Sequence, residues 1–281
     1  MRIPCSADEV RRLSPEEMRA ILDTDKQGDY ILLDVRQPEE YEAGYIPGAI
    51  LIPLGELEAR QEELDQSKKI IAYCRSGHRS MAAAMTLCGL GFKDIHHLEG
   101  GIINWHYETI PGMPEERPEL IARTTDVRDI LMLAIKLEKD SWDFYMAAKD
   151  KASLPRVRET LQMLADVEDD HMQRLYECTA NLVGEKALPP LEKLKLELRV
   201  EHMEGGIEIS PALAKVEEFA GEMEALEIAL EREFMSYDFY KRSSMLVGNP
   251  NVKTLLYELA LEERNHADTL LKRVSEIVQK R

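Results

Sequence analysis

The sequence predicts two domains: an α/β domain with a central, largely parallel sheet and flanking helices, followed by an all-α four-helix bundle. Three observations lead to this prediction. A length of 281 residues fits about two domains. Residues 1–110 alternate short apolar runs with glycine-bearing turns, whereas almost everything from Thr125 onward has helical periodicity. The second half also repeats itself, as shown below.

In the first half, the apolar runs at residues 30–35 and 69–73 have the length of buried strands, and βα units around a parallel sheet are expected. The segment YETIPGMPEERPEL contains three prolines and a glycine and is typical of a linker. We therefore expect a first domain at residues 1–110, a linker at 111–124 and a bundle at 125–281. An interruption at about residues 184–211 predicts a long crossover within the bundle.

Composition excludes several classes of function. A net charge of −17, with no basic stretch to offset it, argues against nucleic-acid binding and against docking on an anionic membrane. There is no apolar run near 18 residues, and the N-terminal sequence lacks the apolar core of a signal peptide, so we expect a cytoplasmic protein. The four cysteines form no CxxC pair, which excludes a rubredoxin-like or zinc-ribbon module, and isolated cysteines are expected to be free thiols there.

The second half contains an internal repeat with one constant offset. AIKLEKDSWDFY, which begins at Ala134, matches ALEREFMSYDFY, which begins at Ala229, and LQMLADVEDDHMQRL matches LLYELALEERNHADTL. The offset is 95 residues in both cases (233 − 138 = 95 and 266 − 171 = 95). Pro155 maps onto Pro250 under the same shift, near the start of the second helix of each repeat, where proline is tolerated.

Each of the four predicted helices carries acidic residues within its apolar stripe, and two of them add a histidine three residues later. These residues are Glu138, Glu168, His171, Glu233, Glu263 and His266. Burying several carboxylates together is costly unless a cation lies between them. A pair of divalent metals would serve, and carboxylate with imidazole suits iron and also manganese. This ligand pattern is the one found in ferritin-like di-iron bundles.

A solvated surface is the usual explanation for a single ExxH motif, but two such motifs with one common offset favour a di-metal site. The nearby aromatic residues are expected to be core residues, although a tyrosine near iron could also donate a hydrogen bond or an electron. These are Trp142, Tyr145, Tyr237 and Tyr240.

The segment IIAYCRSGHRSMAAAM places Cys74 after an apolar strand and before a helix. Backbone amides at a helix N-terminus bind anions and lower a thiol pKa, so a reactive thiolate is expected, helped by the positive charges of Arg75 and Arg79. The alternative is a structural cysteine at a strand end. Cys88, on the next helix, is expected to be inert.

Residues 125–280 resemble the rubrerythrin branch of the ferritin-like superfamily, through IKLEKDSWDFY, ADVEDDH, LEREFMSYDFY and LEERNH. The resemblance implies an antiparallel bundle, metal ligands at the six residues given above, and reduction of peroxide or dioxygen with an external electron donor. Two features depart from the family. Ser236 stands where rubrerythrins have a further glutamate, and the sequence has no iron–sulfur rubredoxin module.

Residues 6–108 resemble single-domain rhodaneses, through LLDVRQPEEYEAGYIPGAILIP, IIAYCRSGHRSMAAA and HHLEGGIINW. The resemblance implies that Cys74 accepts sulfane sulfur as a persulfide and passes it to a small acceptor, with Arg79 and the loop amides stabilising the anion. The loop has four intervening residues, as in sulfurtransferases, whereas related phosphatases have a longer loop. The expected substrate-binding residues are Arg75, Ser76, Gly77, His78 and Ser80. His78 either tunes the site or is simply an exposed loop residue, and we slightly favour the second interpretation.

Together these patterns predict a bifunctional sulfur and redox enzyme that forms a homo-oligomer, with a dimer expected. Two alternatives stay open at this stage. One is an iron-binding or ferroxidase module, and the other is a regulatory protein whose rhodanese domain only senses or supplies sulfur.

Overall fold

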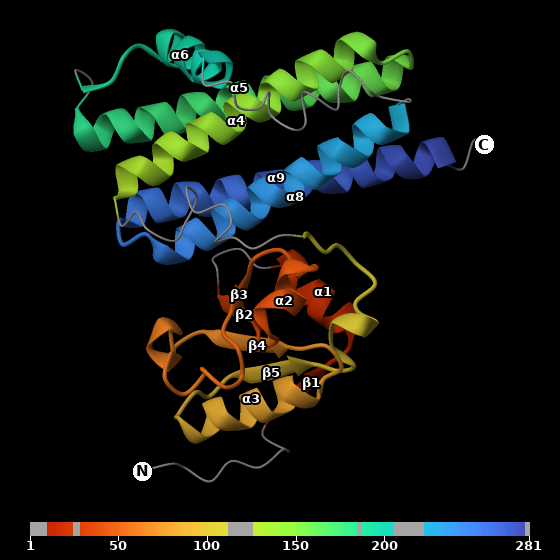
Figure 1. The fold of residues 1–281 in the computed structure, drawn as a ribbon, viewed down its shortest axis with the longest axis vertical. Helices are drawn as coiled ribbons and strands as arrows, with labels where there is room; N and C mark the ends of the chain where they lie inside the picture. Colours follow the sequence, from red (N-terminus) through yellow and green to blue (C-terminus); the bar gives the residue numbers. More distant parts are fainter. Residues whose placement is uncertain (1–9, 25–28, 112–125, 185–186, 205–221, 279–281) are drawn as a thin grey trace. The chain divides into compact units, whose positions relative to one another are not determined.

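The computed structural model describes residues 10–24, 29–111, 126–184, 187–204 and 222–278 (Figure 1). The chain divides into two compact units, Met1–Arg117 and Pro118–Arg281, and each is described by itself. Residues 112–124 of the predicted linker, and residues 185–186 and 205–211 of the predicted crossover, lie outside the described residues.

The first unit is a five-stranded sheet with strand order β1-β5-β4-β2-β3, and every pairing in it is parallel. Its strands are β1 (Arg11–Leu13), β2 (Tyr30–Asp34), β3 (Ala49–Leu51), β4 (Lys69–Tyr73) and β5 (Ile95–Leu98). Its helices are α1 (Pro15–Thr24), α2 (Pro38–Glu42), η2 (Gln61–Glu63), α3 (His78–Gly89) and η3 (Gly101–Asn104). The predicted α/β fold with a parallel sheet is confirmed, and β2 and β4 coincide with the two predicted strands to within one residue.

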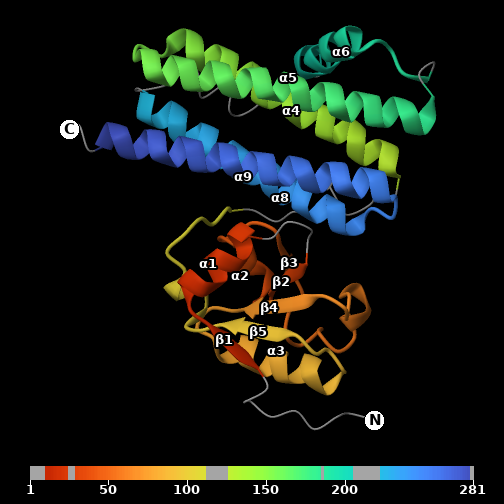
Figure 2. The same cartoon turned by 180° about the vertical axis from the view of Figure 1, so that it is seen from behind.

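Helices cover both faces of this sheet, as a parallel sheet requires. Figures 1 and 2 show α1 and α2 on one face and α3 on the other. On the α3 side, Ala83 and Leu87 pack against buried strand residues such as Leu33 and Ile70. Cys74 belongs to the same buried cluster, at the carboxyl end of the central strand β4. The edge where parallel strands end is the common position of ligand sites in such folds.

The second unit is helical, as predicted, and consists of two long hairpins that pack as a bundle (Figures 1 and 2). Helix α4 (Val127–Lys151) packs along α5 (Pro155–Val183), and α8 (Glu222–Leu246) packs along α9 (Pro250–Val278). The shorter α6 (Leu191–Glu204) lies in the predicted crossover and contacts α4. Asp126 caps α4 by accepting a hydrogen bond from the Arg128 amide, and both second helices begin at the repeated prolines.

The core of the bundle contains two apolar clusters with a band of polar residues between them in sequence. One cluster includes Leu131, Leu175, Tyr240 and Leu256. The other includes Tyr145, Leu164, Leu226 and Leu270. Each of the four long helices contributes residues to one cluster before its predicted glutamate ligand and to the other cluster after it. Apolar packing therefore fixes the helices on both sides of the polar band.

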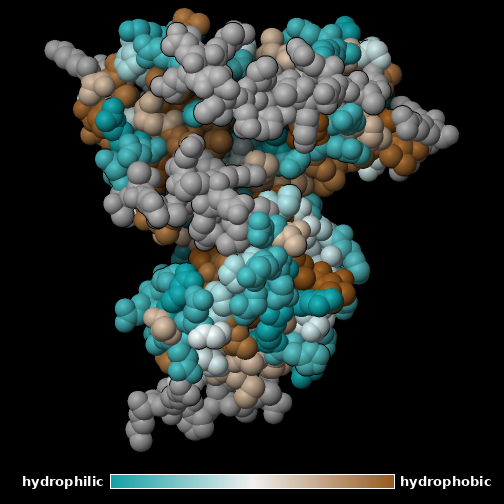
Figure 3. Space-filling view, viewed as in Figure 1, coloured by the Kyte–Doolittle hydropathy of each residue, from teal (hydrophilic) through white to brown (hydrophobic). Residues whose placement is uncertain are grey.

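The described surface mixes hydrophilic and hydrophobic side chains on the face drawn in Figure 3. Large exposed hydrophobic residues, such as Ile103, Leu196 and Leu246, belong to different elements. Among the residues that the structure describes, no helix is long and apolar enough to cross a membrane.

Candidate functional sites

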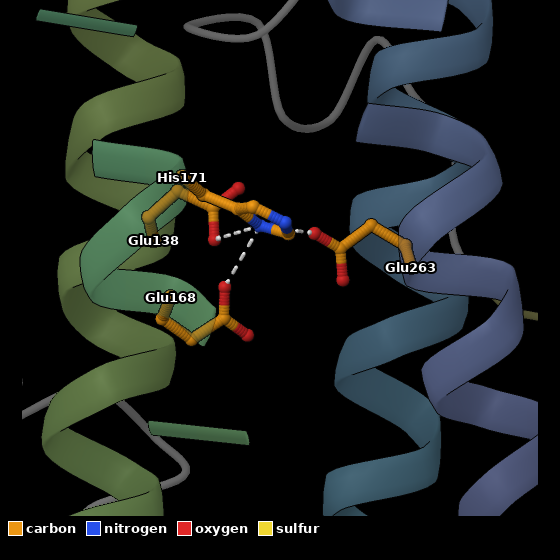
Figure 4. A group of neighbouring side chains, drawn as sticks. All are labelled: Glu138, Glu168, His171 and Glu263. Atoms are coloured by element: carbon orange, nitrogen blue, oxygen red, sulfur yellow. Dashed lines mark ion pairs between the residues drawn. The ribbon is translucent and has the colours of Figure 1, made fainter. Parts of the chain in front are cut away.

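The polar band of the bundle brings three carboxylates to one imidazole (Figure 4). The Nδ1 atom of His171 lies 3.3 Å from Glu168 Oε2, 3.6 Å from Glu138 Oε2 and 3.1 Å from Glu263 Oε1. These side chains come from α4, α5 and α9, and each is at most 2% exposed. One ligand atom from each of the four residues lies within 4.8 Å of all the others.

The same four atoms have no hydrogen-bond partner. Glu138 Oε2, Glu168 Oε2, His171 Nδ1 and Glu263 Oε1 are all buried and unsatisfied within the described part of the chain. Leaving even one buried polar atom unpaired is costly, and four that face a common point are rare in a folded protein. A divalent cation would satisfy all four, and nitrogen with carboxylate oxygen is a donor set that iron and manganese accept.

A second group of possible ligands lies beside the first. His266 Nδ1 is 3.2 Å from Glu233 Oε2 and 3.6 Å from Glu263 Oε2. Glu263 therefore belongs to both groups, with one oxygen facing each histidine. Glu263 would therefore contribute to both metal positions if each group held an ion. All six residues predicted as metal ligands are brought together by the structure.

Two tyrosines connect the halves of the repeat. The Tyr145 hydroxyl donates to Glu233 Oε1 at 2.5 Å, and the Tyr240 hydroxyl donates to Glu138 Oε1. Each tyrosine follows its own helix's glutamate by seven residues, two helical turns, and therefore lies on the same face. Each glutamate thus presents one oxygen to the cluster and the other to a tyrosine of the opposite hairpin.

The electrostatics of the metal-free site reflect crowded negative charge. Burial raises the pKa of Glu168 well above its ordinary value, and the nearby Glu138 and Glu263 raise it further. Burial lowers the pKa of His171, but the surrounding carboxylates, Glu138 foremost, raise it more, and the net shift is upward. The site therefore holds protons that a bound metal would displace.

In the first unit, Cys74 stands at the end of β4 and its thiol faces the turn that starts α3. The Gly77 amide donates to Cys74 Sγ at 3.1 Å. Gly77 is the N-terminal cap of α3 and has φ +92°, a conformation that glycine adopts without strain. The sulfur therefore lies at a helix N-terminus, where backbone amides and the helix dipole favour an anion.

The Glu99-Gly100-Gly101 turn and the start of η3 hold the cysteine loop in place. The Ile102 amide donates to the Cys74 carbonyl at 2.8 Å, and the Ile103 amide donates to the Arg75 carbonyl at 3.2 Å. A Cβ atom on Gly101 would lie only 2.4 Å from the Cys74 carbonyl oxygen. Only glycine allows the two segments to approach so closely.

The other predicted loop residues differ in their exposure. Arg75, Ser76 and His78 are exposed, and Ser76 Oγ lies 3.2 Å from His78 Nδ1. Ser80 is fully buried, and its hydroxyl donates to the Gly77 carbonyl, so it supports the start of α3.

Arg79 pairs with a residue that the sequence did not suggest. Its guanidinium donates two hydrogen bonds of 2.7 Å to the Glu40 carboxylate on α2, and this contact lowers the pKa of Glu40 to about 2. Part of the Arg79 charge is therefore neutralised. The exposed Arg75 directly follows Cys74 in the chain and adds a second positive charge beside it.

Of the three cysteines in the described residues, two are free thiols and one is not. Cys74 and Cys178 are free thiols. Cys88 is disulfide-bonded, which corrects the expectation that isolated cysteines here are all reduced. Spacing gave no signal for this bond, since no two cysteines form a short motif, and Cys5 lies outside the described residues.

Comparison with known proteins agrees with this division. The rubrerythrin family model matches residues 129–273, which is about half of the chain. The chain belongs to the rubrerythrin family. The rhodanese-like domain model matches residues 14–108, so the suspected fusion of the two is confirmed.

Curated relatives match the rhodanese-like part. "Putative sulfur carrier protein YrkF" of Bacillus subtilis is 38% identical over 104 residues, which are 37% of this chain and 55% of that protein. The thiosulfate sulfurtransferase GlpE of Pseudomonas syringae is 30% identical over 108 residues, which are 37% of this chain and 98% of that protein. Some relatives are therefore matched over little more than half of their length.

A solved structure of a rhodanese-related protein from Thermoplasma volcanium is 33% identical and covers 36% of this chain and 97% of its own. Its TM-score is 0.32.

Proposed function

We propose that this rubrerythrin-family chain is a bifunctional sulfur and redox enzyme. Cys74 accepts sulfane sulfur as a persulfide, and the bundle holds a di-iron centre that reduces peroxide or dioxygen. The observation that carries the proposal is the set of four buried, unpartnered ligand atoms around His171, next to a second group that shares Glu263. Sulfurtransferases among the relatives of the first unit support its part.

In the sulfur reaction, the Cys74 thiolate attacks the outer sulfur of a small sulfane donor. The S–S bond of the donor breaks, its remainder leaves with the electron pair, and a new S–S bond forms at Cys74. The Gly77 amide donates to the sulfur, and the helix N-terminus stabilises its charge. The exposed Arg75 is placed to attract an anionic donor. A nucleophilic acceptor then takes the outer sulfur and restores the thiolate.

In the bundle, bound iron would supply the electrons that reduce the oxidant, and an external donor would replace them. The chain's own residues would hold the metals and orient the carboxylates. The six predicted ligands are the residues that would hold them. Tyr145 and Tyr240 fix the outer oxygens of Glu233 and Glu138, so each carboxylate keeps its other oxygen directed inward. The buried, apolar surroundings of the band limit the access of bulk water.

One experiment on the full chain tests both halves with two variants that control each other. Metal content after anaerobic loading with Fe²⁺ and thiosulfate:cyanide sulfurtransferase activity are measured for wild type, Cys74→Ser and Glu138→Ala. We expect about two irons and sulfurtransferase activity in wild type. Cys74→Ser should lose the sulfurtransferase activity and keep the iron. Glu138→Ala should lose iron and keep the sulfurtransferase activity. A wild-type chain that binds no iron would contradict the di-iron proposal, and unchanged activity in Cys74→Ser would contradict the persulfide proposal.

A further inference from the structure

His171 and His266 differ in the contacts of the ring nitrogen that does not face the carboxylate cluster. His171 Nε2 lies 3.0 Å from Glu262 Oε2, so a carboxylate on α9 reaches across to a histidine on α5. Arg174, one turn after His171, donates to both oxygens of Glu262 at 2.9 and 2.8 Å. The three side chains form a relay from guanidinium to carboxylate to imidazole.

This relay selects one form of the His171 ring. An ionised carboxylate only accepts hydrogen bonds, so Nε2 must carry the proton that it donates to Glu262. Nδ1 is then the ring nitrogen that a metal would bind after displacing its proton, and it lies 3.1 to 3.6 Å from the three carboxylates. Carboxylates that hold a histidine in this way fix its ring orientation and raise its basicity as a ligand.

At the positions that correspond under the repeat, the described residues give His266 no such support. Under the 95-residue offset, Glu262 corresponds to Val167 and Arg174 corresponds to Thr269. Valine cannot accept a hydrogen bond, and the Thr269 hydroxyl donates to the Asn265 carbonyl of its own helix. The His266 side chain is also 14% exposed, compared with 0% for His171.

We propose that Glu262 and Arg174 are positioning residues that make the two metal positions unequal. The position at His171 binds a divalent metal first and more tightly. The position at His266 binds more weakly, exchanges its metal, and is the one that small molecules reach. The inference rests on the proposed two-metal function and adds an order of loading that the ligand set alone does not give.

The test is a titration of the metal-free full chain with Co²⁺ in the presence of a competing chelator. Isothermal titration calorimetry measures the binding steps. We expect two separate binding steps in wild type. His266→Ala should keep the tighter step, and His171→Ala should keep the weaker one, which assigns each step to a position.

Glu262→Gln should weaken the tighter step by about 10- to 100-fold and leave the weaker step nearly unchanged. Glu258→Gln is the matched control. Glu258 lies one turn earlier on α9 and contacts Arg174 at 3.5 Å, and its substitution should leave both steps as they are in wild type. A variant that merely loosened the fold would weaken both steps together, so the selective loss distinguishes positioning from general destabilisation.

The other outcomes separate this inference from the proposed function. Two equal steps in wild type, or equal weakening of both steps in Glu262→Gln, would overturn the inequality and leave the two-metal centre standing. A chain that binds no Co²⁺ at all would overturn both proposals.

Discussion

At the residue scale, the two tyrosine hydroxyls are the contacts that hold the glutamates of α4 and α8. Replacing Tyr240 by Phe removes the donor to Glu138 Oε1 and leaves a buried carboxylate oxygen without its partner. Leaving such an atom unsatisfied costs about 1–3 kcal/mol. We expect Tyr240→Phe and its repeat counterpart Tyr145→Phe to lower the free energy of unfolding of the metal-free chain by this amount, as measured by urea denaturation.

Tyr237→Phe is the control for this prediction. Tyr237 lies on the same helix as Tyr240 and is also buried, but its ring packs under the Arg264 guanidinium. Its substitution should have a clearly smaller effect. If Tyr145→Phe and Tyr240→Phe were as stable as wild type, the hydrogen bonds across the hairpins would not be holding the glutamates.

At the scale of elements, the turn before η3 determines the shape of the cysteine loop. A Cβ atom at Gly101 would meet the backbone of Cys74 at 2.4 Å and of Arg75 at 2.6 Å, and backbone atoms cannot move aside as a flexible side chain can. Gly101→Ala should therefore displace the loop. Because misplacing a reacting group by about 1 Å can cost on the order of 100-fold in rate, we expect a loss of that size in sulfurtransferase activity.

Gly91→Ala is the control that separates displacement of the cysteine loop from the backbone strain of an alanine at positive φ. Gly91 also has a positive φ, +100°, but nothing lies within 4 Å of the position of its added Cβ. This variant should lose some stability to strain and keep its sulfurtransferase activity. Equal activity in Gly101→Ala and Gly91→Ala would show that the turn does not position the loop.

The elements themselves were largely predictable, because their signals are local. Periodicity and the 95-residue offset predicted the bundle helices, and Pro155 and Pro250 mark two of their starts. Contacts between distant segments gave no such signal. Glu40 reaches Arg79 across 39 residues, and Glu262 reaches His171 across 91, and neither acidic residue differs in its local sequence from its solvated neighbours. Only the packing of the elements reveals which of many glutamates make these contacts.

At the scale of the whole molecule, the charge of the metal-free centre makes the stability of the bundle depend on pH. Burial, together with the nearby Glu263, raises the pKa of Glu233 to about 8. Burial lowers the pKa of His266, but hydrogen bonds with Glu233 and Glu263 raise it to about 10 overall. In the folded metal-free chain, Glu233 therefore holds more proton than in the unfolded chain between about pH 4.5 and 8, and His266 does so between about pH 6.5 and 10.

The sign follows from this difference in bound protons. Glu233 opposes folding increasingly as the pH rises from about 4.5 to 8, because the unfolded carboxyl ionises there and the buried one does not. The stabilising contribution of His266 to the free energy of unfolding is complete below about pH 6.5 and is lost as the pH rises toward 10. Both groups make the metal-free bundle less stable at higher pH. A bound metal displaces these protons, so the metal-loaded bundle should lack this dependence.

We therefore expect the gain in Tm on adding divalent metal to increase between pH 5.5 and pH 8. With one metal concentration used throughout, chosen about 100-fold above the Kd at pH 8, the gain in free energy at pH 8 is about 3 kcal/mol, or roughly 5–10 °C for a unit of this size. Scanning calorimetry of the full chain measures it, and an unfolding transition of the rhodanese-like unit that metal does not shift provides the internal control. A gain that stayed constant or fell with rising pH would mean that protons on these buried residues are not what the metal replaces.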